Sequence, residues 1–183
     1  MSLLIVGCGY VGKELVRWLR QQIDWADQPI SVLTRSEQQA ESLLHAGLRP
    51  LVGHWLLPES LPVAPTVSRV LVSVPHRGDT ISGLPKDSDQ SHVLGLQNLI
   101  SWLASSNTVH SAPTRLIYLS TTGVFGSSKP GEEVSETTPV SPTRPGPRIA
   151  VAAERWLAQN RQRCPSVVLR LAGIYDPGRV PLI

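Results

Sequence analysis

The sequence has little cysteine and lacks both long hydrophobic runs and dense basic runs. Its two cysteines, Cys8 and Cys164, do not form a spacing such as Cys-x-x-Cys, so we expect no metal site. No apolar run reaches the roughly 20 residues that a transmembrane helix needs, and no signal peptide pattern opens the chain. The arginines are scattered without interleaved aromatic residues, unlike a nucleic-acid-binding surface. These absences predict a cytoplasmic protein without membrane or nucleic-acid partners.

The composition is that of a folded globular protein. The chain has 183 residues, of which 41% are apolar and 17% are charged, which is enough for one domain with a hydrophobic core. Its net charge of +3 suits an anionic ligand. We therefore expect residues 1–183 to form a single domain.

A glycine-rich turn near the start of the chain is the most informative motif. An apolar segment, 3–6, is followed by Gly7-Cys-Gly-Tyr-Val-Gly12 and then by a helical pattern. A strand, a Gly-x-Gly-x-x-Gly turn and a helix N-terminus together bind the pyrophosphate of a dinucleotide. A glycine-rich turn without a ligand is the alternative. Cys8 either gains thiolate character from the helix dipole or is only a small residue that fits the turn.

Each glycine of the motif has an expected role. Gly7 allows the tight turn out of the strand, Gly9 leaves room for the phosphates, and Gly12 lets the helix pack close to the strand. The N–H groups of the first helical turn, which includes Tyr10 and Val11, are expected to face the anion. We therefore predict that these five residues bind the cofactor.

Apolar segments and helical patterns alternate along the chain. The helix after the glycine turn places Val11, Leu15, Trp18 and Leu19 on one face. The pattern predicts strands at 3–6, 30–33, from 51, 70–74, 116–119 and 167–171, and further helices at about 36–47, 91–103 and 149–159. The fold class is therefore α/β, a Rossmann-like doubly wound parallel sheet with helices on both faces. Two proline-rich stretches, 56–68 and 127–147, are expected to be loops, and the second is expected to border a site.

The end of the second predicted strand bears on the choice of dinucleotide. An acidic residue there would bind the ribose 2′-hydroxyl of NAD and repel the 2′-phosphate of NADP. The chain instead has Thr34-Arg-Ser36 and no acidic residue before Glu37. Arg35 can pair with a phosphate, and Thr34 and Ser36 can add hydroxyl donors. We predict NADP(H) rather than NAD(H); the alternative is a solvent-facing arginine beside an N-cap serine.

Three further segments resemble the extended short-chain dehydrogenase/reductase family, the epimerase/dehydratase group. They are Leu116-Ile-Tyr-Leu-Ser-Thr-Thr-Gly-Val-Phe-Gly126, Glu136-Thr-Thr-Pro-Val-Ser-Pro142 and Arg170-Leu-Ala-Gly-Ile-Tyr-Asp-Pro-Gly178, where Asp176 stands in for a glycine. With the glycine turn, the resemblance covers essentially the whole chain. It implies a nicotinamide cofactor and a small-molecule substrate.

The resemblance also implies which residues carry the chemistry. The family uses a Ser/Thr, a Tyr and a Lys. The Ser/Thr position falls on Thr121, which we predict to be catalytic. The Tyr-x-x-x-Lys positions, counted from Gly126, fall on Gly146 and Ala150, which can transfer no proton. The usual acid–base pair is therefore missing from this sequence.

Other residues are candidates to take over its role. Ser73, Val74 and Pro75 lie at the end of the fourth predicted strand and just after it, and are expected beside the cofactor, with His76 and Arg77 near its nicotinamide end. A histidine there could donate a proton, although an exposed loop histidine is the ordinary alternative. Arg144 and Arg148 flank the empty tyrosine position and either bind an anionic substrate or are simply solvated.

The resemblance leaves two functions open. The family continues past the sixth strand into a smaller C-terminal lobe, whereas this chain ends in Val180-Pro-Leu-Ile183. We expect either a truncated form or a substrate side that another subunit completes, as in a homo-oligomer. The protein is then an atypical oxidoreductase or epimerase, or else a non-catalytic module that senses NADP(H).

Overall fold

The computed structural model describes residues 1–76, 89–106, 115–127 and 131–176. Six strands form one parallel sheet in the order β3-β2-β1-β4-β5-β6. The strands are β1 (Leu3–Val6), β2 (Ile30–Thr34), β3 (Arg49–Val52), β4 (Arg69–Val72), β5 (Arg115–Thr121) and β6 (Ser166–Leu171). The helices are α1 (Tyr10–Leu19), α2 (Glu37–His45), α3 (Ser91–Ala104) and α4 (Pro145–Gln159), with short 3-10 turns η1 (Pro58–Ser60) and η2 (Thr122–Phe125).

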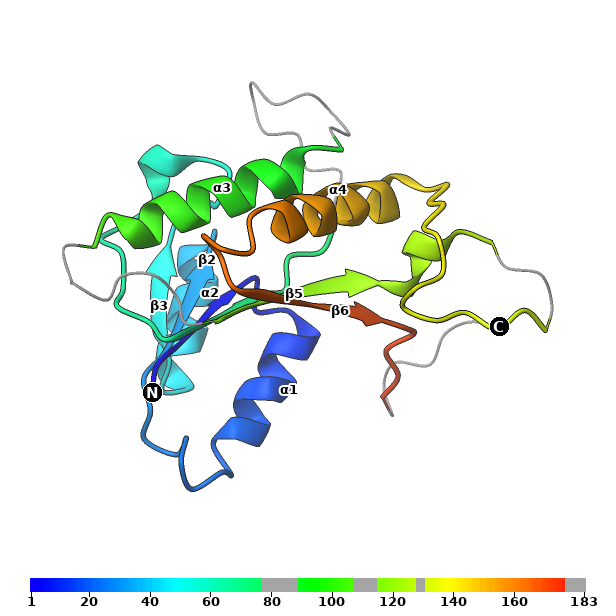
Figure 1. Ribbon diagram of the computed structural model, residues 1–183. Helices are drawn as coiled ribbons and strands as arrows, with labels where there is room; N and C mark the ends of the chain where they lie inside the picture. Colours follow the sequence, from blue (N-terminus) through cyan, green and yellow to red (C-terminus); the bar gives the residue numbers. More distant parts are fainter. Residues whose placement is uncertain (77–88, 107–114, 128–130, 177–183) are drawn as a thin grey trace.

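The helices cover both faces of the sheet, as the sequence predicts for a doubly wound α/β fold. In Figure 1, α1 and α2 lie on one side of the sheet and α3 and α4 on the other. The strand order reverses direction at β1, because β2 and β3 lie on one side of it and β4, β5 and β6 on the other. The loops that leave β1 and β4 therefore diverge to opposite faces, and the crevice between them is where such sheets bind ligands.

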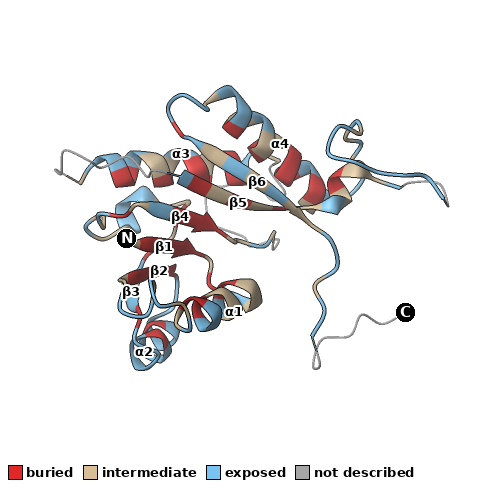
Figure 2. Cartoon of the chain, turned by 60° about the horizontal axis from the view of Figure 1, so that its bottom comes forward, coloured by how far each residue is buried: buried red, intermediate tan, exposed pale blue. Residues whose placement is uncertain are grey.

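The strands alternate their side chains between two cores. Leu4 and Val6 pack with α3 residues such as Leu96 on one face, while Leu3 and Ile5 pack with Val16 and Leu19 of α1 on the other. Every residue of β1 and β2 is buried, as Figure 2 shows in red. Central parallel strands that are covered on both faces need such continuous apolar runs.

The prediction is wrong for one residue of α1 that we placed on the buried face. Trp18 is 57% exposed, and Val16 is buried in its place together with Gly12 and Leu19. Residues 12, 16 and 19 have the i, i+4, i+7 spacing of one helix face, so the buried stripe is rotated from the predicted one. Val11 and Leu15 lie at its edge and are half-buried.

Several element boundaries differ from the prediction, and two of them border the site. Strand β4 ends at Val72, two residues early, and α4 begins at Pro145, four residues early. Pro145 and Pro147 lie in the first turn of α4, where the missing N–H groups break no helical hydrogen bond. The proline-rich stretch after residue 127 is therefore shorter than predicted.

Strand β6 is the edge of the sheet and is only partly covered. Val167 and Leu169 are 40% and 43% exposed, on the face opposite α4. In Figure 2, β6 is mostly tan and pale blue, in contrast to the red of β1 and β4. None of the described helices has the length and apolar character needed to span a membrane.

Candidate functional site

The turn after β1 lies against the loop after β4. Gly7 has φ +83°, and a Cβ atom at this position would lie 2.8 Å from the carbonyl oxygen of Ser73. The amide of Ser73 donates to the carbonyl of Val6 at 2.8 Å. Only glycine combines this backbone conformation with this close approach. Position 7 therefore joins the two loops that border the crevice.

The other two glycines of the motif differ in their surroundings. Gly9 is exposed, and a Cβ atom there would meet no protein atom within 4 Å, so the space beside it is open. A Cβ atom at Gly12 would lie 3.2 Å from Sγ of Cys8 and 3.4 Å from Ile5, so α1 packs tightly on the strand. The role predicted for Gly12 is confirmed by this packing.

The start of α1 has the properties of an anion site. Gly9 is the N-cap, and the first turn, which includes Tyr10 and Val11, contains no acidic residue. The first amides of an α-helix have no carbonyl partner within the helix, and the positive end of its dipole lies there. The residues that border the open space therefore fit a diphosphate.

Cys8 is not an activated thiol. Its side chain is buried, and this burial raises the pKa of the Cys8 thiol, while the nearby Lys13 charge opposes the shift to a smaller extent. A raised pKa keeps the thiol protonated and unreactive. Of the two roles considered for Cys8, the structure favours the small residue that fits the turn.

The end of β2 places Arg35 at the surface beside the glycine turn. Strand β2 pairs with β1, so that Leu33 lies opposite Val6, and Arg35 follows two residues later with an exposed side chain. The hydroxyl of Thr34 is buried and donates to Oε1 of Gln39 at 2.6 Å. Thr34 therefore holds α2 in place. We expected its hydroxyl to donate to a phosphate, but in the structure Gln39 accepts the hydroxyl hydrogen.

Ser36 is the N-cap of α2. Its hydroxyl oxygen accepts from the amide of Gln39 at 3.3 Å, as in the first half of a capping box. The hydroxyl hydrogen of Ser36 remains able to donate outward. Gly47, the predicted helix stop, follows α2 with φ +69°.

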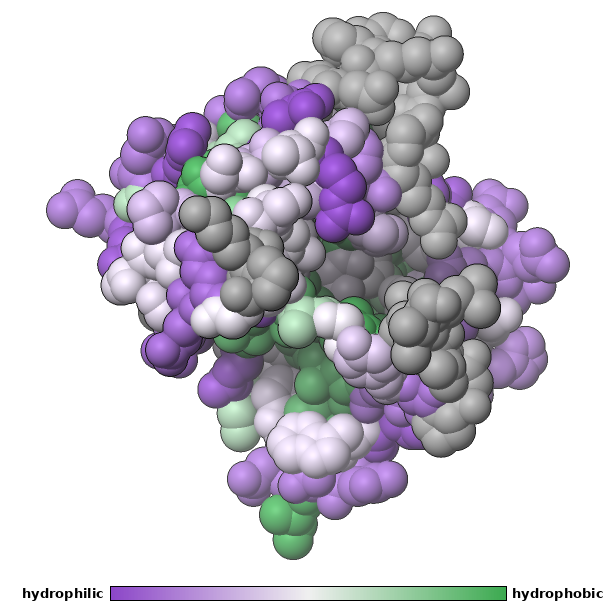
Figure 3. All heavy atoms as spheres, turned by 90° about the vertical axis from the view of Figure 1, so that its right-hand side faces the viewer, coloured by the Kyte–Doolittle hydropathy of each residue, from purple (hydrophilic) through white to green (hydrophobic). Residues whose placement is uncertain are grey.

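A cavity of about 400 Å³ lies at the carboxyl ends of β4 and β5. Its walls include the loop after β4, the end of β5 and the first turns of α4, with the polar side chains of His76, Ser120, Thr121 and Arg144 among them. Val74 and Pro75 line it, whereas Ser73 lies behind them against Gly7. Figure 3 views the molecule from the side toward which β5 and β6 run and shows a hollow whose depth is more hydrophobic than its surroundings.

Thr121 is at the mouth of this cavity with its hydroxyl oriented by the backbone. Its Oγ1 accepts from the amide of Gly123 at 3.1 Å, which leaves the hydroxyl hydrogen free to donate. Thr121 borders a second hollow as well, on the side of Arg170 and Glu136. A donor at this position can bind a carbonyl or carbinol oxygen.

Gly146 and Ala150, the positions that the resemblance assigns to a tyrosine and a lysine, line the same cavity. A Cβ atom on Gly146 would lie 3.5 Å from Cβ and Cδ2 of His76. The imidazole of His76 therefore occupies the side of the cavity onto which a side chain at position 146 would project.

A buried histidine and tyrosine form the floor of the cavity. Nδ1 of His92 on α3 lies 2.7 Å from the hydroxyl of Tyr118 on β5, and the ring of Trp55 packs edge-on against His92. Burial lowers the pKa of His92 to about 4, with a smaller contribution from His76, and burial raises the pKa of Tyr118. Both side chains are therefore neutral near pH 7.

Sequence reasoning missed the histidine of this pair. His92 is 7% exposed and lies one, two and three turns before Leu96, Leu99 and Leu103. This i, i+4, i+7 spacing is the signal that could have found it.

A second polar group supports β5 from α4. The hydroxyl of Ser120 donates to Glu154, which also binds Arg170 of β6 through a 2.7 Å contact. Arg170 lies over the ring of Phe125 at 4.9 Å, and its hydrogen bond to Glu154 raises the pKa of the guanidinium. This arrangement fixes the end of β5, and thereby Thr121, relative to α4.

The two arginines that flank the cavity differ. Arg144 lines it and extends past Gly123, while Arg148 points away and pairs with Asp89 at 3.3 Å on the surface. For Arg148 the solvated alternative is therefore confirmed. Arg77 falls outside the described residues.

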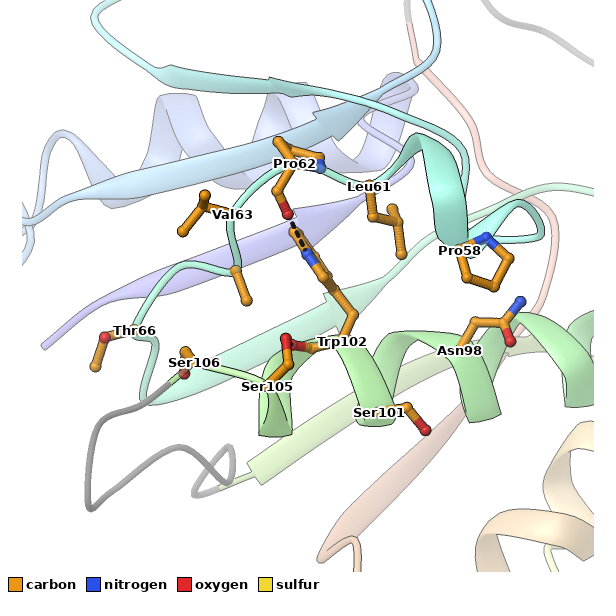
Figure 4. Close-up of a pocket in the computed structure, with 11 residues that line it drawn as sticks. Pro58, Leu61, Pro62, Val63, Thr66, Asn98, Ser101, Trp102, Ser105 and Ser106 are labelled. Carbon is orange, nitrogen blue, oxygen red and sulfur yellow. Dashed lines mark hydrogen bonds between the residues drawn. The ribbon is translucent and has the colours of Figure 1, made fainter.

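A larger hollow of about 740 Å³ lies at the other end of α3. The loop that contains Pro62 borders it, and Nε1 of Trp102 donates to the carbonyl of Pro62 at 2.6 Å (Figure 4). Ten residues of helix, about 15 Å, separate Trp102 from His92. This hollow is remote from the glycine turn, and the described residues that line it include no acid–base or metal-binding cluster.

The described residues contain no group of three or more His, Cys, Asp or Glu side chains that could hold a metal ion. The strand order and the glycine turn are those of an α/β protein of the Rossmann type. The family model described as NAD dependent epimerase/dehydratase family matches residues 3–181, and the chain belongs to this family.

Solved structures agree with this assignment. A functionally unknown conserved protein from Silicibacter pomeroyi is 33% identical, with a TM-score of 0.67, and the match covers 97% of this chain and 54% of that one. A putative NAD-dependent epimerase/dehydratase from Methylobacillus flagellatus is 27% identical, with a TM-score of 0.68 and coverages of 97% and 56%.

A solved structure with lower sequence identity supports the fold alone. A UDP-glucuronic acid 4-epimerase from Bacillus cereus, solved in complex with NAD, is 17% identical, with a TM-score of 0.68 and coverages of 98% and 59%. The chain thus spans little more than half the length of these proteins. A search of curated proteins found no match.

Proposed function

We propose that the protein binds a nicotinamide nucleotide in the crevice between the loops after β1 and β4. The observation that carries this proposal is the open space beside Gly9, next to the first amides of a helix without an acidic residue in its first turn. The pyrophosphate lies there, held by the first N–H groups of α1, since the Gly9 amide itself donates to the carbonyl of Gly7 at 3.0 Å. The nicotinamide end then extends past Val74 and Pro75 toward the cavity that Thr121 lines.

We further propose that the phosphorylated nucleotide, NADP(H), is preferred. The exposed Arg35 follows β2 beside the glycine turn, and Ser36 retains a hydroxyl hydrogen to donate. A guanidinium can form two hydrogen bonds with a 2′-phosphate, and no carboxylate on β2 opposes it. Thr34 has no part in this contact, because Gln39 already accepts its hydrogen.

The bound nucleotide would exchange a hydride with a small-molecule substrate. Thr121 would donate its hydroxyl hydrogen to the substrate oxygen, which positions the reacting carbon and stabilises charge on the oxygen. The exposed Arg144 at the cavity wall favours a substrate with an anionic group. The protein is therefore proposed to be an oxidoreductase or epimerase with an atypical acid–base group.

Calorimetric titration of NADP⁺ and NAD⁺ tests the cofactor proposal. We expect tighter binding of NADP⁺, and we expect Arg35→Ala to weaken NADP⁺ by about 10- to 100-fold while NAD⁺ changes little, which is the value of a charged hydrogen-bonded pair. Arg161→Ala, an exposed arginine after α4, is the matched control. Equal affinities for both nucleotides would contradict the preference.

Measurements of turnover test the proposal that the protein is an oxidoreductase or epimerase. NADP⁺ or NAD⁺ is incubated with UDP-glucuronic acid, the substrate type named for the Bacillus cereus neighbour, and with small hydroxy acids. We expect the wild type to form reduced nucleotide or an epimerised product, and we expect Thr121→Val to lower the rate of this turnover by at least tenfold. Tight nucleotide binding without any turnover would instead favour a module that senses NADP(H).

A further inference from the structure

His76 lies beside position 146, where the resemblance places a tyrosine. The ring of His76 packs on Gly146, where an added Cβ atom would make ordinary contact at 3.5 Å with Cβ and Cδ2 of the histidine. Both residues line the cavity that Thr121 borders. We infer that His76 is the catalytic acid–base residue of this protein and exchanges a proton with the substrate oxygen. This inference rests on the proposed function.

The backbone brings His76 to the end of the crevice. Ser73 touches Gly7 and is bonded to Val6, so the loop after β4 starts against the glycine turn. Val74 and Pro75 continue along the cavity wall, and His76 follows on the side of α4. The imidazole therefore borders the cavity into which a ligand held at the glycine turn would extend.

The other titratable groups of the cavity are unsuited to this exchange. His92 and Tyr118 are buried and bonded to each other, and burial lowers the pKa of the histidine to about 4 and raises that of the tyrosine. Arg144 stays charged at all working pH values. The remaining imidazole on the described cavity wall is that of His76, whose two ring nitrogens can accept or donate a proton.

The proposed step balances in atoms and electrons. The substrate carbinol loses its O–H proton to an imidazole nitrogen of neutral His76, while the hydrogen on its carbon leaves with the bonding pair as hydride. The oxidised nicotinamide nucleotide is the oxidant and becomes the reduced form. A carbonyl compound and a histidinium remain, and the reverse reaction returns the same proton to the oxygen.

The charges around His76 would change with the redox state of a bound nucleotide. His92 from α3 and Tyr118 from β5 are neutral, and Arg144, the residue before α4, is the cation on the cavity wall. An oxidised nicotinamide ring would add a second positive charge, which the reduced ring lacks.

The decisive experiment follows the His76 ring by NMR in complexes with NADP⁺ and with NADPH. The chain has five histidines, and the signal is assigned through its loss in His76→Gln. We expect the ring signals to move when either nucleotide binds and to differ between the two complexes, because only NADP⁺ carries a positive charge on its nicotinamide ring. Ring signals that stay unchanged in two saturated complexes would overturn the inference but leave cofactor binding intact, whereas failure of both nucleotides to bind would overturn both proposals.

Reduction of 4-nitrobenzaldehyde by NADPH provides the kinetic test. We expect His76→Gln to lower kcat by 10²- to 10⁴-fold, as loss of a general acid does, with nucleotide affinity within twofold of the wild type. His45→Gln, at the exposed end of α2, is the matched control. An unchanged kcat in His76→Gln, or a wild-type protein that holds NADPH without reducing the aldehyde, would overturn the assignment.

Discussion

The imidazole of His92 and the hydroxyl of Tyr118 are hydrogen-bonded at 2.7 Å between α3 and β5, and both are almost fully buried. Beneath the cavity, each of these two side chains is the hydrogen-bond partner of the other. Loss of either partner leaves a buried polar atom unsatisfied, which costs about 1–3 kcal/mol. The pair therefore fixes how α3 sits on the sheet.

We expect Tyr118→Phe to lower the free energy of unfolding by about 1–3 kcal/mol in urea denaturation, because His92 then lacks its partner. Tyr175→Phe, at a tyrosine that is 68% exposed, should change it by less than about 0.5 kcal/mol. The double variant His92→Leu/Tyr118→Phe should lose less than the sum of its single variants. Strict additivity would contradict the coupling.

The buried histidine should also make stability depend on pH. The pKa of His92 is lowered to about 4 by burial, from an ordinary value near 6.5, so the unfolded chain binds the extra proton between these values. Its contribution is complete above about pH 6.5 and is lost as the pH falls toward 4, by about 3 kcal/mol in total. His92→Asn, which cannot titrate, should flatten the urea-derived stability curve in this window; an unaltered slope would contradict the lowered pKa.

The ion pair beneath β5 should be worth more than a pair on the surface. Arg170 and Glu154 are 23% and 10% exposed, whereas Arg148 and Asp89 are 42% and 43% exposed. We expect Arg170→Met to cost about 2–4 kcal/mol, since it leaves the shielded Glu154 carboxylate unpaired, and Arg148→Met to cost less than about 1 kcal/mol. Chemical denaturation of both variants compares them directly, and equal losses would refute the distinction.

Much of the fold could be predicted because the signals are local. The apolar runs at 3–6 and 30–33 have the composition of buried parallel strands, and Gly7 marks the turn that follows the first. The missed start of α4 at Pro145 has a local reason too, because prolines that suggest a loop also suit a first helical turn.

The site was harder to predict because its contacts join distant segments. The 2.7 Å contact of His92 with Tyr118 spans 26 residues, and that of Glu154 with Arg170 depends on how α4 packs on β5 and β6. The exposure of Trp18 was also hard to predict, because the helical pattern alone did not fix which stripe of α1 faces the sheet. His76 was a weak candidate until its packing against Gly146 was known.

Gly7 and Gly9, two of the three glycines of the phosphate turn, should respond differently to substitution by alanine. Gly7→Ala forces a side chain into a φ of +83° and to within 2.8 Å of the Ser73 carbonyl, so we expect a loss of stability above about 2 kcal/mol. Gly9→Ala meets no atom within 4 Å and has an ordinary φ of −79°, so its unfolding midpoint should stay close to the wild-type value.

The central claim is that the open space at Gly9 holds the diphosphate of a nicotinamide nucleotide. The most direct measurement is the dissociation constant of NADP⁺ for the wild type and for Gly9→Ala, beside their thermal unfolding midpoints. The account predicts a stable variant whose affinity falls by at least about tenfold, because the added methyl group displaces the phosphates from the amides. A stable Gly9→Ala protein that binds NADP⁺ as tightly as the wild type would contradict it.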